Sequence, residues 1–264
     1  MDSSDKKTVV AVVSDFKFLN SNFNKLYDQL RGHGNYQGEI LVITSRFSPS
    51  FLIKSIRKKN KVKVLRFKNI KFDKITEFEL NNLKTYNDPN RNLTKKFQWH
   101  KLHLFDEFIK NWDYVFYLDI NMNIHSDINP ILALTPENCF MARSDTYPKY
   151  DRELKTQFDQ SHPLYIELEK NYDLSVNDYF QTGVMYFDTK IISKHTKNEI
   201  IDLVNKYPIS KTNEQGTLNL YLYLQKKKYR ELPSKINGYT TYFYWKLNNE
   251  NIIITKQLTE PNKY

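Results

Sequence analysis

Asp119 and Asn121 combine residue types and a spacing that could hold a metal ion. They follow an apolar run, Tyr114–Leu118, which predicts a buried strand. Ligands of parallel α/β sheets bind beyond the carboxyl ends of the strands, so both side chains would face a ligand. A carboxylate and an amide oxygen can ligate a hard divalent cation, and such a cation could neutralise a diphosphate. An aspartate after a strand is also a common turn former, and this alternative stays open.

Two polar segments further along the chain are candidates for the rest of a site. Asp178–Phe187 is a polar turn that leads into an apolar strand, and its Gly183 would let a ligand approach the backbone closely. Asn213–Asn219 starts with a helix-capping residue type, and the acidic residue after it suits a first helical turn. Glu214 and Gln215 could instead face a sugar in a cleft. A plain loop-to-strand junction and a simple helix cap are the alternatives.

Hydrophobic spacing predicts the elements that would position these residues. Strand, helix, strand, helix and strand follow one another over the first 67 residues, which is the pattern of a mainly parallel sheet flanked by helices. Strands are expected at Thr8–Val13, Ile40–Thr44, Val62–Phe67, Tyr114–Leu118, from Phe140 and at Thr182–Phe187. Helices are expected over Leu19–Leu30, from a Ser48-Pro49 cap to about Lys59, and over Phe97–Ile109, Ile191–Tyr207 and Glu214–Lys226. We predict one α/β domain over residues 1–264, with a core at about 8–258.

Composition narrows the function classes. The 264 residues are 40% hydrophobic and 27% charged, which is typical of a folded protein. The net charge of +10 favours polyanionic partners, such as nucleic acid, an anionic membrane or phosphorylated small molecules. The densest basic stretch, Lys54–Lys68, is expected to be a solvated surface. No run of about 18 apolar residues predicts a transmembrane helix, and Met1–Lys7 lacks the apolar core of a signal peptide, so we expect a cytoplasmic protein.

The segments above, in their order and spacing, resemble the retaining nucleotide-sugar transferases of glycosyltransferase family 8, which includes glycogenin and galactinol synthase. The likeness runs from about Val9 to Leu258. The matching motifs are Lys101-Leu102 before the Asp-x-Asp-like Asp119–Asn121, then Asp178–Val184, Glu214–Asn219 and Leu232–Asn237.

This resemblance implies a GT-A (Rossmann-like) fold, a UDP-sugar donor, Mn²⁺ or Mg²⁺, and retention of the anomeric configuration. It implies that Asp119 and Asn121 hold the metal and that Glu214, Gln215 and Asp178 are catalytic candidates. The donor would be bound by Val13, Ser14, Phe16 or Phe18, Lys101, Asp119, Ile120, Asn121, Arg143, Gln181, Thr182 and Gly183. The acceptor is left open among a glycan, a protein and a lipid.

The chain also departs from the family pattern. Asn121, Gln181 and Glu214 stand where the family has Asp, Asn and Asp. The family's C-terminal His-x-x-Gly-x-x-Lys-Pro-Trp stretch corresponds to Ile252–Lys256, which has no histidine, and Lys256 is not counted among the expected donor residues. These departures keep a second hypothesis open, a degenerate module that binds nucleotide or glycan without turnover. A third, a basic nucleic-acid-binding protein, has charge in its favour but no accompanying motif, so we expect no specific nucleic-acid partner.

Overall fold

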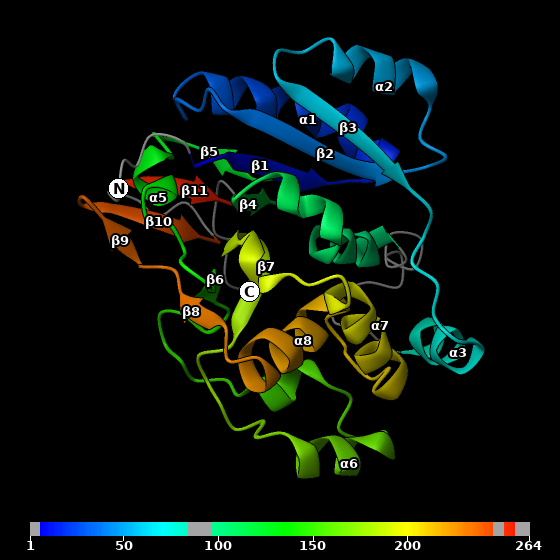
Figure 1. Ribbon diagram of the computed structural model, residues 1–264. Helices are drawn as coiled ribbons and strands as arrows, with labels where there is room; N and C mark the ends of the chain where they lie inside the picture. Colours follow the sequence, from blue (N-terminus) through cyan, green and yellow to red (C-terminus); the bar gives the residue numbers. More distant parts are fainter. Residues whose placement is uncertain (1–5, 84–96, 245–250, 257–264) are drawn as a thin grey trace, which may run out of the picture.

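A seven-stranded sheet forms the centre of the molecule (Figure 1). The computed structural model describes residues 6–83, 97–244 and 251–256. The strands lie in the order β3-β2-β1-β4-β7-β6-β8, where β3, β2, β1 and β4 are parallel and β7 is antiparallel to both of its neighbours. Their bounds are β1 Thr8–Val13, β2 Glu39–Ser45, β3 Val62–Phe67, β4 Tyr114–Leu118, β6 Phe140–Ser144, β7 Phe180–Asp188 and β8 Tyr229–Glu231. The predicted mainly parallel α/β sheet is therefore confirmed.

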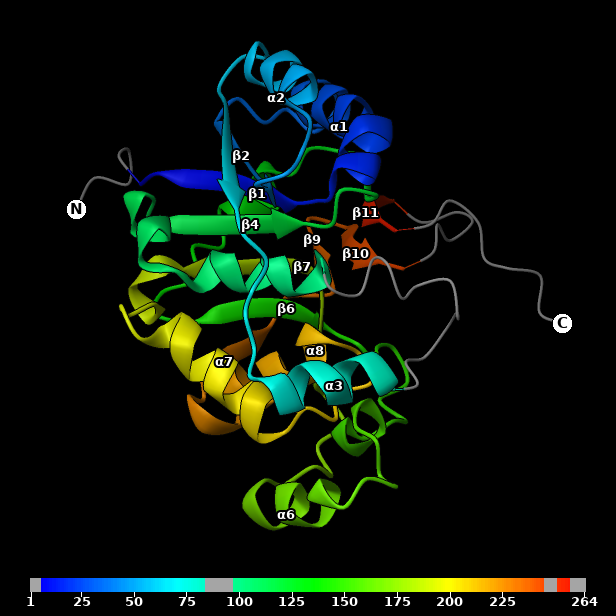
Figure 2. The same ribbon diagram turned by 90° about the vertical axis from the view of Figure 1, so that its right-hand side faces the viewer.

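Helices cover both faces of this sheet, because its central strands are buried on both sides. Val10 and Val12 of β1 pack with α1 (Phe16–Arg31) and α2 (Ser50–Arg57) on one face. The alternate residues of β1 face η3 (Trp99–Phe105), α7 (Thr196–Lys206) and α8 (Glu214–Leu218) on the other. Figure 2 shows the two helical layers on either side of the sheet. The remaining helical segments are α3 Lys74–Asn82, η4 Glu107–Asn111, α5 Asn129–Leu132, η5 Leu154–Gln157, α6 Leu164–Asn171, η6 Thr189–Ile191 and η7 Asn219–Gln225.

A second, four-stranded sheet lies beside the carboxyl end of β4. Its order is β5-β11-β10-β9, with β5 Asn123–Ile124, β9 Lys235–Ile236, β10 Tyr239–Phe243 and β11 Ile252–Thr255. Thr255 of β11 pairs with Asn123 of β5, four residues beyond Asp119. This pairing brings the end of the described C-terminal segment next to the strand end on which the sequence places a site.

Several helices differ from their sequence prediction. The helix expected over Phe97–Ile109 is two 3-10 segments, η3 and η4, because the backbone is extended at Asp106 between them. The helix expected over Glu214–Lys226 becomes a π-helix, η7, from Asn219 onward. There the Asn219 side chain accepts from the N–H of Phe180 and donates to its carbonyl, which ties the helix to β7.

Smaller differences concern helix starts. The helix expected from Ile191 begins at Thr196, after the short η6. Ser48 does not cap α2, because its hydroxyl is hydrogen-bonded to that of Thr44 at 2.8 Å. Most basic side chains of the Lys54–Lys68 stretch are exposed on α2, β3 and the turn between them, as the charge pattern predicted. None of the helices in the described segments is long and apolar enough to cross a membrane.

Candidate active site

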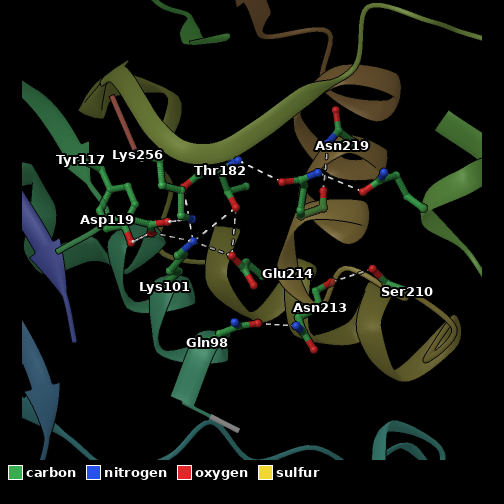
Figure 3. Close-up of polar contacts among 12 residues, drawn as sticks. Gln98, Lys101, Tyr117, Asp119, Thr182, Ser210, Asn213, Glu214, Asn219 and Lys256 are labelled. Atoms are coloured by element: carbon green, nitrogen blue, oxygen red, sulfur yellow. Dashed lines mark hydrogen bonds and ion pairs between the residues drawn. The ribbon is translucent and has the colours of Figure 1, made fainter. Parts of the chain in front are cut away.

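Asp119 lies at the centre of a buried ionic cluster at the carboxyl end of β4 (Figure 3). Its backbone N–H donates to the Gly183 carbonyl of β7 at 2.9 Å, which fixes it against the neighbouring strand. Tyr117 donates to Oδ1 at 2.7 Å, and Lys101 Nζ lies 3.1 Å from the same oxygen. Lys256 Nζ lies 2.9 Å from Oδ2. Both oxygens of the carboxylate therefore have cationic partners from the protein.

Lys101 connects Asp119 to a second carboxylate, that of Glu214. Lys101 Nζ lies 2.7 Å from Glu214 Oε1, and the Thr182 hydroxyl donates to that oxygen at 2.9 Å. Lys101 also donates to the Thr182 carbonyl at 3.3 Å. Only 4% of the Glu214 side chain and 11% of the Lys101 side chain is exposed. The cluster thus ties together η3, β4, β7 and α8 in a water-poor environment, where ionic interactions are strong.

The pKa values in this cluster favour its charged form. Burial by itself would raise the pKa of the Asp119 carboxyl, but Lys101 and Lys256 outweigh it and hold that pKa below its ordinary value. Burial would likewise lower the pKa of Lys101, but Asp119 and Glu214 raise it above its ordinary value. Burial, and then the charge of Asp119, raises the pKa of the Tyr117 hydroxyl, so Tyr117 stays a neutral donor. The Asp119 carboxylate and the Lys101 ammonium are therefore charged at neutral pH.

Gln215 is held in a fixed orientation next to this cluster. Its Oε1 accepts from the Thr182 N–H at 3.2 Å, and its Nε2 donates to Gln157 Oε1 at 2.9 Å. Burial raises the pKa of the nearby Asp145 carboxyl, against the opposing effects of Arg152 and of hydrogen bonds from Tyr179 and Gln215. Because Thr182 and Gln157 hold the two ends of the Gln215 amide, a substrate beside Gln215 would meet a group that is already oriented.

Two cavities open on either side of the cluster. The smaller, of about 190 Å³, is lined on its far side by Val13, Ser14, Asp15, Phe18, Phe97, Ile120 and Asn121. The larger, of about 420 Å³, is lined by further polar residues that include Asp145, Arg152, Gln157, Gln181, Glu214 and Gln215. Four residues line both cavities: Gln98, Lys101, Asp119 and Lys256. The ionic cluster is thus the junction between a partly apolar cavity and a polar one.

Most of the residues expected from the sequence line these cavities. Val13, Ser14, Ile120 and Asn121 line the smaller one, together with Lys101 and Asp119. Gln181, Thr182, Gly183, Glu214 and Gln215 line the larger one. Gly183 packs closely there, since a Cβ on it would lie 2.9 Å from the Met122 Cε atom and 3.3 Å from Gln181 Oε1.

Three expected residues do not line either cavity. Asp178 accepts a hydrogen bond from the Tyr223 hydroxyl. Arg143 is buried in an ion pair with Glu231 at 2.8 Å. Phe16, at the start of α1, is 56% exposed, and its neighbour Phe18 lines the smaller cavity instead.

Asn213 does not cap α8 with its side chain, contrary to the sequence interpretation. Its backbone φ is 54°, and its side-chain amide donates to Gln98 across the cavity mouth. The sequence also missed Gln157 and Asp145, which line the larger cavity. Asp145 directly follows a strand, as Asp119 does, so the same signal could have found it. For Gln157, in the short η5, no sequence signal was available.

The side chains at Asp119 fit a divalent cation poorly. A hard cation in a protein takes about six oxygen ligands, usually with carboxylates among them. In the segments that the structure describes, no three histidine, cysteine, aspartate or glutamate side chains converge on one point. His100 and His103, close in sequence to Lys101, hydrogen-bond to Asn69 and to the Lys68 carbonyl instead. A cation on Asp119 would have to displace an ammonium group first, and manganese at Asp119 and Asn121 stays a prediction from the sequence.

Comparisons with known proteins agree with this architecture. The sequence model of glycosyl transferase family 8 matches residues 8–259. No curated protein sequence matches the chain. Among solved structures, the galactosyltransferase LgtC in complex with donor and acceptor sugar analogues is similar, with a TM-score of 0.60 and 15% identity over 88% of this chain and 75% of LgtC.

Two further solved structures are similar over most of this chain. Mouse xyloside xylosyltransferase 1 has a TM-score of 0.54 and 10% identity, over 96% of this chain and 97% of that one. The mannosyltransferase Ktr4p from S. cerevisiae in complex with GDP has a TM-score of 0.54 and 13% identity, over 90% and 72%. At these identities the likeness shows the fold, and it confirms the expected GT-A fold class.

Proposed function

The chain belongs to glycosyl transferase family 8, and from this membership we propose that its single domain transfers a sugar from a UDP-sugar to an acceptor hydroxyl, with retention of the anomeric configuration. One observation carries the proposal: two cavities of different chemistry meet at a junction that contains the ammonium groups of Lys101 and Lys256, both paired with Asp119. A nucleotide sugar has the same three parts, a base, a diphosphate and a sugar. Its negatively charged middle part matches the junction.

In this arrangement the nucleoside lies in the smaller cavity. Val13 and Ile120 offer apolar contacts there, and Phe18 is an aromatic side chain on which a base can stack. The sugar lies in the larger cavity, whose amide, carboxylate and hydroxyl groups can hydrogen-bond to sugar hydroxyls. The diphosphate then spans the junction between the two cavities.

The transfer step depends on holding the donor and stabilising its leaving group. When the bond between the anomeric carbon and the phosphate oxygen breaks, negative charge accumulates on the diphosphate. Lys256 and Lys101 are fixed at that place before the reaction, so they need no reorganisation as the charge develops. The acceptor hydroxyl forms the new bond to the anomeric carbon, which the cavity holds within reach, and its proton passes to the oxygen of the departing diphosphate.

Gln215 and Glu214 have different roles in this proposal. Gln215 is oriented by Thr182 and Gln157, and we place its side chain against the reacting face of the sugar. Glu214 has one carboxylate oxygen engaged by Lys101 and Thr182, so it is a positioning residue that holds the Lys101 ammonium in place. Asp178 lines neither cavity and has no role in the reaction as we propose it.

The resemblance to family 8 also implies manganese or magnesium, and Asp119 and Asn121 are the residues that would hold it. We assign no step to that cation, because both oxygens of Asp119 are engaged by ammonium groups. The acceptor is a glycan, a protein or a lipid, and the larger cavity, whose lining includes Arg152 and Lys211, is where we place its entry.

A binding module without turnover is the second candidate. The neutral Asn121 and the longer Gln181 favour it, because both depart from the pattern that the sequence resembles. A donor panel separates the two functions: UDP-sugars and GDP-sugars are incubated with the protein, and the release of free UDP or GDP is measured. The proposal predicts release from at least one UDP-sugar and a large loss in Gln215→Ala. Nucleotide binding without any release, across donors and acceptors, would favour the binding module.

A further inference from the structure

We infer that Lys256 takes the place of a divalent cation on Asp119, so that the donor diphosphate is bound by lysine side chains without a metal ion. The inference rests on the proposed function, since it concerns how the same nucleotide sugar is held. It starts from the position of the Lys256 ammonium, 2.9 Å from Asp119 Oδ2 and on the wall of both cavities. A cation that bridges a strand-end carboxylate and a diphosphate would have to lie in this same region.

The backbone fixes Lys256 in this position. Lys256 directly follows β11, and Thr255, the last residue of that strand, pairs with Asn123 of β5. The Asn123 side chain also donates to the Lys256 carbonyl at 3.3 Å. Both β5 and Asp119 belong to the segment that follows β4, so a single short stretch of chain sets the position of the carboxylate and of the lysine that pairs with it. The ion pair is therefore part of the fold.

Lys256 and Lys101 differ in how many of their N–H groups the protein uses. Lys101 faces four acceptor atoms, which are Asp119 Oδ1, Glu214 Oε1 and the carbonyl and hydroxyl oxygens of Thr182, and these are enough to occupy the three N–H bonds of an ammonium. In the described residues, the acceptor of Lys256 is Asp119, and its Nζ also lies 6.0 Å from the centre of the Tyr244 ring. With 26% of its side chain exposed, Lys256 can turn its other N–H groups toward phosphate oxygens at the junction.

Charge balance supports the same conclusion. In the family pattern, position 121 carries a second carboxylate, with one negative charge, and a divalent cation adds two positive charges. Together they would add one positive charge to the cluster. Asn121 is neutral, and Lys256 adds one positive charge. The exchange of a carboxylate and a metal ion for an amide and a lysine therefore leaves the local charge unchanged. Asn121, in place of the family's aspartate, weakens a metal site. Lys256, paired with Asp119, supplies the positive charge that the metal ion would otherwise provide.

Calorimetric titration with UDP tests this inference in EDTA and, separately, in Mn²⁺. The parent protein should bind UDP with the same Kd in both conditions, within about threefold. Lys256→Met should weaken UDP binding in EDTA by about tenfold or more, as expected for a lost charge-assisted hydrogen bond. Lys235→Met, on the exposed edge of the same small sheet, is the matched control and should bind UDP as the parent does. Circular dichroism checks that each variant is folded.

A double variant provides the converse test. Asn121→Asp combined with Lys256→Met restores a pair of carboxylates and frees Asp119 Oδ2, so its UDP affinity should be at least about tenfold higher in Mn²⁺ than in EDTA. Parent binding that is lost in EDTA and restored by Mn²⁺ would overturn the inference and leave the proposed function standing. Unchanged binding by Lys256→Met in EDTA would also overturn it. Failure of the parent to bind UDP or GDP in either condition would overturn the proposed donor site and the inference with it.

Discussion

Lys101 Nζ and Glu214 Oε1 lie 2.7 Å apart, with almost no exposed surface on the glutamate side chain. Lys101 comes from η3 and Glu214 from the first turn of α8, so the ion pair joins two elements that are distant in the sequence. Buried charges of this kind are tolerated only when they are paired. The pair therefore serves stability and also holds an ammonium group at the junction of the two cavities.

Lys101→Met should destabilise the fold, because it leaves Glu214 buried without its cationic partner. Removing one partner of a buried ion pair costs about 3–5 kcal/mol, which corresponds to a fall in melting temperature of roughly 5–9 °C in a chain of this size. Differential scanning calorimetry measures the change. Lys101→Met combined with Glu214→Gln should recover part of the loss, because the buried carboxylate is then neutral. A single variant that melts within one degree of the parent would contradict this account of the pair.

Gln215→Ala should lower kcat by about a hundredfold, as when one oriented group at a reaction centre is removed, and should change the donor KM by less than about threefold. Initial rates of UDP release, measured over a range of donor concentrations, separate the two constants. Gln157→Ala, which removes only the orienting partner of Gln215, should show a smaller loss of kcat. An increase in KM at constant kcat would show instead that Gln215 only binds the donor.

Gly183→Ala should weaken donor binding by about tenfold while the fold is kept. The added Cβ would first meet the flexible end of Met122, at 2.9 Å, and then Gln181 Oε1, at 3.3 Å, on the wall of the sugar cavity. Calorimetric titration with the donor measures the change. Gly238→Ala is the control: it lies in open space at a φ of +80°, so it should cost about 1 kcal/mol of stability and leave donor binding unchanged. Equal donor affinity in Gly183→Ala and the parent would exclude this close packing.

Stability should fall with acid below about pH 6.5 because of two buried histidines on η3. Burial, with a smaller effect of Lys197, lowers the pKa of His100 to about 4 and that of His103 to about 3, from an ordinary value of 6.5. The unfolded chain therefore takes up these protons near pH 6.5, and the folded chain only near pH 4 at His100 and near pH 3 at His103. The contribution of the two neutral histidines to the free energy of unfolding is fully present above pH 6.5. It is lost progressively as the pH falls toward 4, by up to about 1.4 kcal/mol per histidine and pH unit.

His103→Phe tests this origin of the acid sensitivity. The new ring can keep the stacking on Phe67, whose centre lies 4.2 Å from that of His103, and it cannot be protonated. Urea midpoints at pH 7, 5.5 and 4.5 should fall less steeply for the variant than for the parent. The same slope in both proteins would assign the acid sensitivity to other groups.

The sequence predicted six strands of the central sheet, because each contains a short apolar run, but it predicted neither β8 nor the four short strands of the small sheet. Asp119 could be placed at a site because it directly follows one of these runs. Lys256 could not, because its contact with Asp119, 137 positions away, depends on the pairing of β5 with β11, and periodicity carries no information on such a pairing. The 3-10 and π segments were missed for a similar reason, since tertiary contacts such as that of Asn219 with Phe180 decide their geometry.

The crystal structure of Gln215→Ala with the nucleotide sugar that the donor panel identifies would test the central claim most directly, because slow turnover keeps the donor intact. We expect the base in the cavity beside Val13 and Phe18, the diphosphate at the junction against Lys101 and Lys256, and the sugar in the cavity beside Gln181. A nucleotide bound at any other place, or a diphosphate that does not contact either lysine, would contradict it.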